Sequence, residues 1–304
     1  MIRLLLWRLA LIPVTVLAVV TVLFVIFKTI PGDEATMIAG ATATQAEIDV
    51  VRHQLGLDRP LLVQYVEHIE GLLHGDLGYS PTFRANPLPR ILERVPATLL
   101  LTASAIALTV IVGIPAGILA ASFQHHWPDF TVSAGVVALL AVPNFWLGMM
   151  LIALFSVQLE WLPSIGLSGP ASLVMPTIAL AARLIALVGR MVRGVVIEEQ
   201  RKDYVRTAYA KGLARPRVLY RHVLRNALIP IVTVIGLQAG YLLGGSVVVE
   251  RLFAWPGIGD LLLTAVGLRD YTLVQGITVL FVIGFLLMNL LVEMLYRLIN
   301  PRLR

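Results

Sequence analysis

The most constraining feature of this sequence is a run of about 19 uncharged residues near its start, from Leu9 to Phe27, bounded by Arg8 and Lys28. An α-helix rises about 1.5 Å per residue, so this run reaches nearly across a hydrocarbon layer roughly 30 Å thick. A cleaved secretory signal would have a shorter apolar core, of roughly 7 to 15 residues. We therefore interpret the run as a transmembrane helix that persists in the mature protein.

Five further apolar stretches, separated by proline, glycine or charged clusters, predict additional spans. The composition agrees, because 58% of the residues are hydrophobic and only 14% are charged, against roughly 25% charged in a soluble domain. The sequence thus predicts an all-α polytopic membrane protein with six transmembrane helices. The five stretches are Ala97 to Ala121, Phe130 to Leu159, Leu173 to Val196, Ala227 to Val249 and Tyr271 to Tyr296.

The distribution of basic residues predicts the orientation in the membrane. An even number of spans puts both termini on one side, and arginines at both ends favour the cytoplasm. The loop after the fourth stretch is rich in arginine and lysine, with only Glu198, Glu199 and Asp203 opposing them, and is predicted to be cytoplasmic as well. Its basic residues are Arg201, Lys202, Arg206, Lys211, Arg215, Arg217, Arg221 and Arg225.

The chain divides into a first helix (1–30), an insertion (31–96) and a five-helix core (97–304) that includes the cytoplasmic loop 197–226. Because the insertion follows the first span of a chain that starts in the cytoplasm, it is predicted to lie on the extracytoplasmic side of the membrane. It is less apolar and predicts helices from Ala46 to Leu55, after the capping residue Thr44, and from Leu61 to Leu73, after Pro60. Its three histidines have no spacing typical of a metal site, so we expect surface residues; they are His53, His68 and His74.

Glycines recur at four-residue intervals in two of the spans, which lines up the missing side chains on one helix face and lets another helix approach closely. They predict helix packing, and the alternative that the fifth span lies at a subunit interface or pore stays open. Pro115 and Pro143 are expected to kink their spans or act as hinges. The glycines are Gly236, Gly240 and Gly244 in the fifth span and Gly113 and Gly117 in the second.

Three polar residues within the spans are candidates for a polar translocation path: Asn144, Arg183 and Gln238. An arginine at a helix centre costs roughly 2.5–3.5 kcal/mol on insertion scales, so Arg183 should face a cavity or a partner, unless its side chain reaches the membrane surface. Asn144 and Gln238 are cheaper to bury and could instead bond between helices. The sequence has no cysteine, which excludes disulfides and thiolate sites.

Several polar runs carry a resemblance to a known family. The loop sequence DYVRTAYAKGL around Gly212 is similar to the EAA loop of ABC importer permeases, in the form found in the dipeptide, oligopeptide and nickel family, and specifically in its B-type subunit. Arg206 and Thr207 replace the Glu and first Ala of the general pattern, and Arg225 replaces its Pro, as in that subgroup. The resemblance covers nearly the whole chain through HVLRNALIP (His222 to Pro230), FAWPGIG (Phe253 to Gly259), GDEA near Gly32, LGLDRPLLVQY near Leu55, GDLGYS (Gly75 to Ser80) and VPNFWLG (Val142 to Gly148).

The resemblance implies a type I ABC importer permease in the bacterial inner membrane, paired as a heterodimer with a second, similar permease. It also implies two cytoplasmic ATPase subunits that hold ATP and Mg, and an extracytoplasmic binding protein that would meet the insertion and Phe253 to Asp270. No phosphate-binding loop G-x-x-x-x-G-K-[ST] occurs, so this chain is expected to have no cofactor and no catalytic residue. The ATPase contacts implied by the EAA loop are Arg206, Thr207, Ala208, Lys211, Gly212, Leu213 and Ala214.

The solute is predicted to be a dipeptide or oligopeptide, with nickel, a metal chelate, glutathione, an opine or a sugar as alternatives within the family. Few acidic residues or histidines lie in the spans, which disfavours a bare cation. A secondary transporter would need ion-binding acids in its spans and usually inverted repeats. A membrane-embedded enzyme would need a motif such as H-E-x-x-H. Neither set of features is seen in the sequence.

Overall fold

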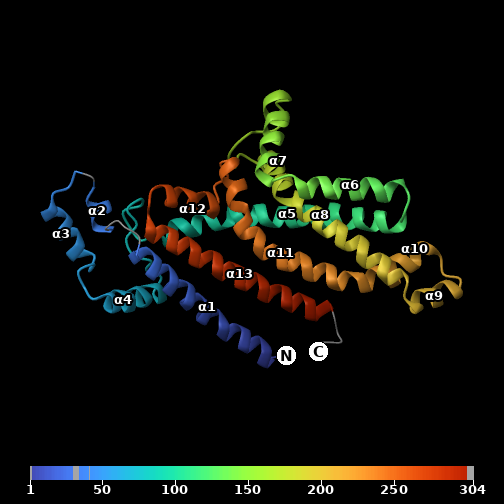
Figure 1. Cartoon of the computed structure of the whole chain (residues 1–304), viewed down its shortest axis with the longest axis horizontal. Coiled ribbons are helices and arrows are strands. Elements are labelled where there is room, and N and C mark those ends of the chain that lie inside the picture. The colour runs from blue at the N-terminus through green and yellow to red at the C-terminus, as the bar shows by residue number, and fades with distance from the viewer. Residues whose placement is uncertain (1, 30–33, 41, 300–304) are drawn as a thin grey trace. The chain divides into compact units, whose positions relative to one another are not determined.

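The computed structural model describes residues 2–29, 34–40 and 42–299, and every regular element of that part is helical (Figure 1). The predicted all-α fold is confirmed. Gly32 and Asp33 of the GDEA run lie outside the described residues. Contacts divide the chain into two units, one comprising Pro96–Asp260 with the chain from Gly284 on, and the other comprising Ile2–Val95 with Leu261–Ile283.

Five helices of the described chain are long and apolar enough to cross a membrane. Each of them contains one predicted span, so hydropathy located the first, second, fourth, fifth and sixth spans correctly. They are α1 (Ile2–Thr29), α5 (Leu88–Ser122), α8 (Pro170–Gln200), α11 (Leu224–Leu252) and α13 (Tyr271–Ile299).

The third predicted span, Phe130 to Leu159, is broken at Pro143, which confirms the kink expected there. The structure has α6 (Trp127–Ala141) and α7 (Asn144–Leu151), followed by a π-helical stretch, η1 (Ile152–Gln158). The two parts meet at a bend of 102°, visible between α6 and α7 in Figure 1. Pro143 causes the break, because proline disfavours helical geometry in the residue before it; Val142 is extended, with ψ 123°. By contrast, α5 continues unbroken through Pro115.

Helix α8 is the centre of the first unit, where it packs against α6, α7 and α11. Its buried face includes several small residues, among them Ala179, Ala182, Ala186 and Gly189. At Gly117 of α5 a Cβ atom would lie 2.6 Å from the backbone oxygen of Gly189, so α5 and α8 approach at backbone distance. The predicted packing role of the α5 glycines therefore has a definite partner in α8.

The three glycines of α11 do not share one role. A Cβ atom at Gly236 would collide with the side chain of Val292, and one at Gly240 would lie 2.8 Å from Phe285, so both glycines admit α13. At Gly244 no described atom lies within 4 Å of the Cβ position. Within this chain the predicted packing role of Gly244 is thus not found, because its face of α11 is uncovered.

A buried carboxylate organises the FAWPGIG run. Glu250 of α11 is fully buried and accepts hydrogen bonds from Thr98 Oγ1 (2.8 Å) and Ser246 Oγ (3.0 Å). It also accepts from the backbone N–H groups of Gly259 (2.7 Å) and Asp260 (3.1 Å), in the first turn of α12 (Ile258–Gly267). Position 257 requires glycine, because a Cβ atom there would collide with this carboxylate. Glu250 therefore caps α12 from a distance.

In the second unit, the predicted helices of the insertion are confirmed as α3 (Gln45–Gln54) and α4 (Leu61–Leu73). Thr44 caps α3 through a capping box with Glu47. A shorter helix, α2 (Glu34–Ala39), was not predicted. The GDLGYS run is held by Asp270, which accepts from Ser80 Oγ and from the backbone N–H groups of Thr82 (3.1 Å) and Leu273 (3.0 Å).

The three histidines of the second unit differ in their surroundings. His53 and His74 are exposed, as predicted, whereas His68 is half-buried and contacts Gln275, with 2.8 Å between the side-chain nitrogen atoms. Burial lowers the pKa of His68, and nearby Lys28 lowers it further. Among the described residues, no three acidic or histidine side chains are placed so as to hold a metal ion.

Replacing Gly236 with alanine is expected to destabilise the isolated chain by about 1–3 kcal/mol, because the added methyl group must displace Val292 in a packed interface. Gly244→Ala is the matched control on the same helix and should change stability little. The measurement is the thermal midpoint of the purified chain in detergent. Equal midpoints for the two variants would contradict the assignment of α13 as the neighbour of Gly236.

Replacing Glu250 with glutamine is expected to cost roughly 1–3 kcal/mol, because an amide group would place a donor against the donors that now converge on the carboxylate. Glu198→Gln, the same change at an exposed position, is the control. Thermal midpoints in detergent would again report the loss. A stable Glu250→Gln variant would show that the carboxylate does not hold the α12 end.

Candidate functional site

The segment between α8 and α11 is anchored by an apolar inner face. It consists of α9 (Asp203–Ala210), α10 (Arg215–Val218) and a π-helical turn, η2 (Leu219–Val223), and is called the α9–α10 segment below. Its buried residues pack in one cluster with Val192 and Val196 of α8 and with Ala227 of α11. The segment is therefore part of the core of the first unit and not a loose loop; its buried members are Val205, Ala208, Val218 and Val223.

Gly212 closes α9 by a Schellman motif. Its φ of +76° is in the left-handed region, and its N–H donates to Tyr209 O (2.9 Å), while the N–H of Leu213 donates to Ala208 O (3.3 Å). This geometry favours glycine strongly, because a side chain is strained at positive φ. The fixed glycine of the EAA pattern thus has a local structural reason in this chain. A Cβ at Gly212 would meet no described atom within 4 Å, so the turn also has an open surface.

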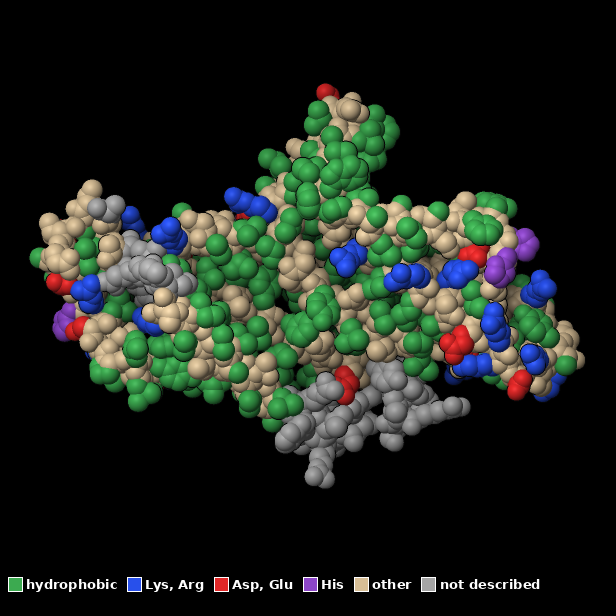
Figure 2. Space-filling view, in the orientation of Figure 1, with side chains coloured by type: hydrophobic (Ala, Val, Ile, Leu, Met, Phe, Trp, Pro, Cys, Tyr) green, Lys and Arg blue, Asp and Glu red, His purple; other side chains and the backbone are tan. Residues whose placement is uncertain are grey.

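The structure divides the seven predicted ATPase contacts into two groups. Ala208 is only 6% exposed and Leu213 packs against the buried cluster, so Ala208 is a core residue and Leu213 is half-buried. Neither is prominent on the surface of this chain, and the predicted ATPase contact of both stays a prediction. Figure 2 shows Lys and Arg side chains gathered where Figure 1 labels α9 and α10. The exposed predicted contacts are Arg206, Thr207, Lys211, Gly212 and Ala214.

Glu199 at the end of α8 joins that helix to α9. Its carboxylate accepts a hydrogen bond from Tyr204 Oη at 2.5 Å and forms an ion pair with Lys202. Burial raises the pKa of Tyr204, and the bond to Glu199 raises it further, so the phenol stays protonated and donates. In the sequence Glu199 stands out only as a charge opposing the basic loop, because the turn after α8 is what brings Tyr204 to its carboxylate.

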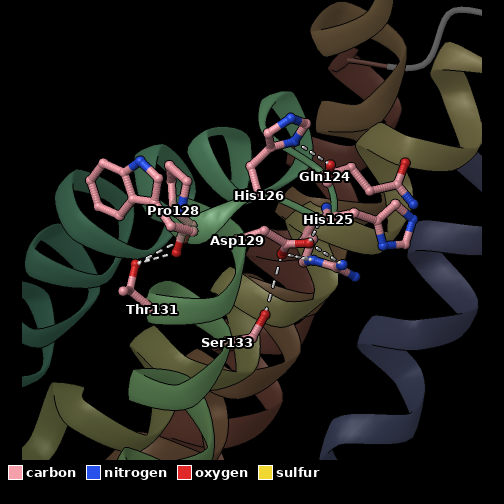
Figure 3. A network of polar contacts seen from close by, with 9 residues as sticks. Gln124, His125, His126, Pro128, Asp129, Thr131 and Ser133 are labelled. Atoms are coloured by element: carbon pink, nitrogen blue, oxygen red, sulfur yellow. Dashed lines mark hydrogen bonds and ion pairs between the residues drawn. The ribbon is translucent and has the colours of Figure 1, made fainter.

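A second ion pair fixes α6 to α8. The buried Asp129 of α6 accepts from Arg193 Nε (2.5 Å) and Nη2 (2.7 Å), a bidentate geometry. It also accepts from the backbone N–H of His125 (3.0 Å), and Figure 3 shows its carboxylate between His125 and Ser133. This pair was not predictable from the sequence, because the two residues lie 64 positions apart.

The three predicted pathway residues lie around one cavity. A hollow of about 330 Å³ in the first unit is lined by Asn144 of α7, Arg183 of α8 and Gln238 of α11. The remaining lining residues are Leu180, Leu184, Tyr241, Leu242 and Gly245. Tyr241 was not predicted, although its position three residues after Gln238 puts both on one helix face. The polar residues that are costly in a membrane are thus collected at one place.

Arg183 is exposed to this cavity, although the adjacent Ala182 and Leu184 of α8 are each 4% exposed. Within the described part of the chain, its guanidinium group has no ion pair or hydrogen bond. The lining includes no acidic side chain. The cavity therefore presents a positive charge with unused hydrogen-bond donors, and we call it the Arg183 cavity.

Comparison with known proteins identifies the family. Residues 113–304 match the family described as "Binding-protein-dependent transport system inner membrane component", and residues 1–102 match "Binding-prot-dependent transport system membrane comp, N-term". Together the two matches cover both units of the structure. The family signal therefore does not depend on the EAA loop alone.

Curated relatives and solved structures agree with this match. The chain is 43% identical over 296 residues to the glutathione transport system permease protein GsiC of Escherichia coli and of Pectobacterium atrosepticum, covering 97% of this chain and 96% of each relative. A chain of the inward-facing MetNI methionine ABC transporter has the same fold, with a TM-score of 0.61, 23% identity, and coverage of 71% of this chain and 99% of that one. A chain of an amino acid ABC transporter matches with a TM-score of 0.55, 17% identity, and coverage of 69% and 94%. The chain therefore belongs to the family of binding-protein-dependent transport system inner membrane components, as a permease subunit of an ABC importer of the dipeptide and oligopeptide type.

Proposed function

We propose that this chain forms half of the solute pathway of an ATP-driven importer of short peptides. The observation that carries the proposal is the 43% identity over 97% of the chain to permeases named for glutathione, which is itself a tripeptide. The predicted class of dipeptides and oligopeptides and the alternative of glutathione therefore converge on one chemistry.

The proposed assembly contains a second, homologous permease, two ATPase subunits that hold ATP and Mg, and an extracytoplasmic binding protein. Both termini and the α9–α10 segment face the cytoplasm in this arrangement, as the basic residues favour. The α2–α4 region and the FAWPGIG run then lie on the opposite side, where the binding protein delivers the solute. Hydrolysis of ATP takes place on the partner subunits, and this chain contributes binding and movement.

The α9–α10 segment is proposed to transmit the movement of the ATPase. Its exposed residues, including Thr207, Lys211 and Gly212, offer a basic surface of small and polar side chains to a groove of the partner. Its inner face shares one buried cluster with α8 and α11. Because a packed core does not deform continuously, a displacement of this segment must shift both helices.

The composition of the assembly can be tested by purifying the tagged chain from its native membrane in mild detergent. We expect a second permease and ATPase subunits to co-purify with ATPase activity, because a permease of this family works only as part of a complex. Proteoliposomes made with the co-purified binding protein should import labelled short peptides. A chain that moves solute alone, without an ATPase, would overturn the proposal.

Replacing Gly212 with aspartate is expected to abolish ATP-driven import while leaving the chain inserted in the membrane. The new side chain projects from the open surface of the turn and would obstruct a docked partner. Gly212→Asn is the matched control, because asparagine is nearly isosteric and tolerates positive φ about as well, without the negative charge. We expect partial import with asparagine.

The readouts for the Gly212 variants are co-purification of the ATPase and peptide import into proteoliposomes. The thermal midpoint of each isolated variant separates backbone strain from loss of docking. Normal assembly and import by Gly212→Asp would falsify the coupling role of the turn.

A further inference from the structure

The Arg183 cavity contains a charge that the fold alone does not balance. Arg183 lies near the middle of α8, about 20 Å from the start of the helix and about 26 Å from its end at 1.5 Å per residue. An arginine side chain near the end of a span can reach the membrane surface, but one near the middle of the helix is too far from that surface to do so. A guanidinium group at this depth therefore needs water, an anion or an acidic partner, and no acidic side chain lines the cavity.

The neighbouring side chains add donors around the guanidinium group. Asn144 and Gln238 each carry an amide with two N–H donors, and Tyr241 carries a hydroxyl group. None of these side-chain groups makes a hydrogen bond within the described residues. A planar guanidinium with amide donors beside it matches the two oxygens of a carboxylate, the usual partner of bidentate arginine.

The cavity opens beside an uncovered stretch of α11. Neither Gly244 nor Gly245 has a described atom within 4 Å of its Cβ position, and Gly245 also lines the cavity. A side chain at Gly245 would add bulk to the wall of the cavity, so glycine at this position leaves room beside Arg183. At about 330 Å³ the cavity lies at the lower end of the range for ligand pockets, roughly 300–1,000 Å³. A cavity of this volume suits one end of a peptide better than an entire peptide.

We propose that the Arg183 cavity binds the free carboxylate of a peptide solute as the solute crosses the membrane. The inference rests on the proposed import of peptides and adds which chemical group the permease itself recognises. Asn144, Gln238 and Tyr241 complete the site by donating to the carboxylate oxygens. A solute without a carboxylate gains nothing from these residues, so the permease contributes to selectivity in addition to the binding protein.

The test uses the whole transporter, co-purified with its partners and reconstituted in proteoliposomes with its binding protein. Import is measured for two labelled probes, a tripeptide with a free C-terminal carboxylate and the same tripeptide as its C-terminal amide. Arg183→Gln should lower import of the acid by roughly tenfold or more, the effect of losing one charged hydrogen bond. Import of the amide should change by less than about twofold, and Arg183→Lys should retain part of the acid import.

The control is Arg190→Gln, which removes a charge from the same helix two turns further along and outside the cavity. We expect it to leave the ratio of acid to amide import as in the unmodified transporter. Because the substitutions are in the permease, the binding protein contributes equally to every sample. Co-purification and ATPase activity of each variant report whether the assembly is intact.

Two outcomes would overturn the inference while leaving peptide import in place. Equal losses for acid and amide in Arg183→Gln would show that Arg183 supports the fold or pairs with an acidic residue of another subunit. Unchanged import of both probes would show that the carboxylate does not meet Arg183. If the unmodified transporter imports neither probe despite ATPase activity, the proposed peptide function itself fails, and the inference with it.

Discussion

The close packing around α8 is the constraint on which the first unit depends. Helices in a bilayer gain little from excluding water, so they associate through close van der Waals contact and hydrogen bonds. The small residues of α8 permit this contact: Gly189 meets Gly117 of α5 at backbone distance, and α6, α7 and α11 pack around the same helix. Any substitution that enlarges this face would separate several helices together.

Buried carboxylates complement that packing at the places where the chain leaves a helix. Asp129 ties the start of α6 to Arg193, Glu250 caps α12, and, in the second unit, Asp270 holds the GDLGYS run. Each accepts several hydrogen bonds, as a carboxylate away from water requires. Donors converge on each from segments that are distant in the sequence. Such hydrogen-bond networks specify one position for each loop, whereas apolar contacts alone, which have no directionality, would not.

Hydropathy and capping patterns were sufficient to predict the long helices and α3 and α4, because these elements depend on local sequence. The break at Pro143 was predictable only as a kink, since its size depends on packing: Gly148 of α7 lies directly against Leu252. The grouping of Asn144, Arg183 and Gln238 followed from the cost of polar groups in a membrane, whereas Tyr241 is unremarkable in a span. The partners of Glu250 were not predictable, because Thr98 lies 152 positions away.

Helix α8 also connects the two candidate functional regions. It is continuous from Pro170 to Gln200, with Arg183 facing the cavity near its middle and Glu199 bonded to Tyr204 of α9 at its end. Arg193, between them, is clamped to Asp129 of α6. A rigid helix turns a displacement at one end into a tilt along its whole length. Under the proposed function, docking or release of the ATPase at the α9–α10 segment therefore moves a wall of the Arg183 cavity directly, without any intervening hinge in this helix.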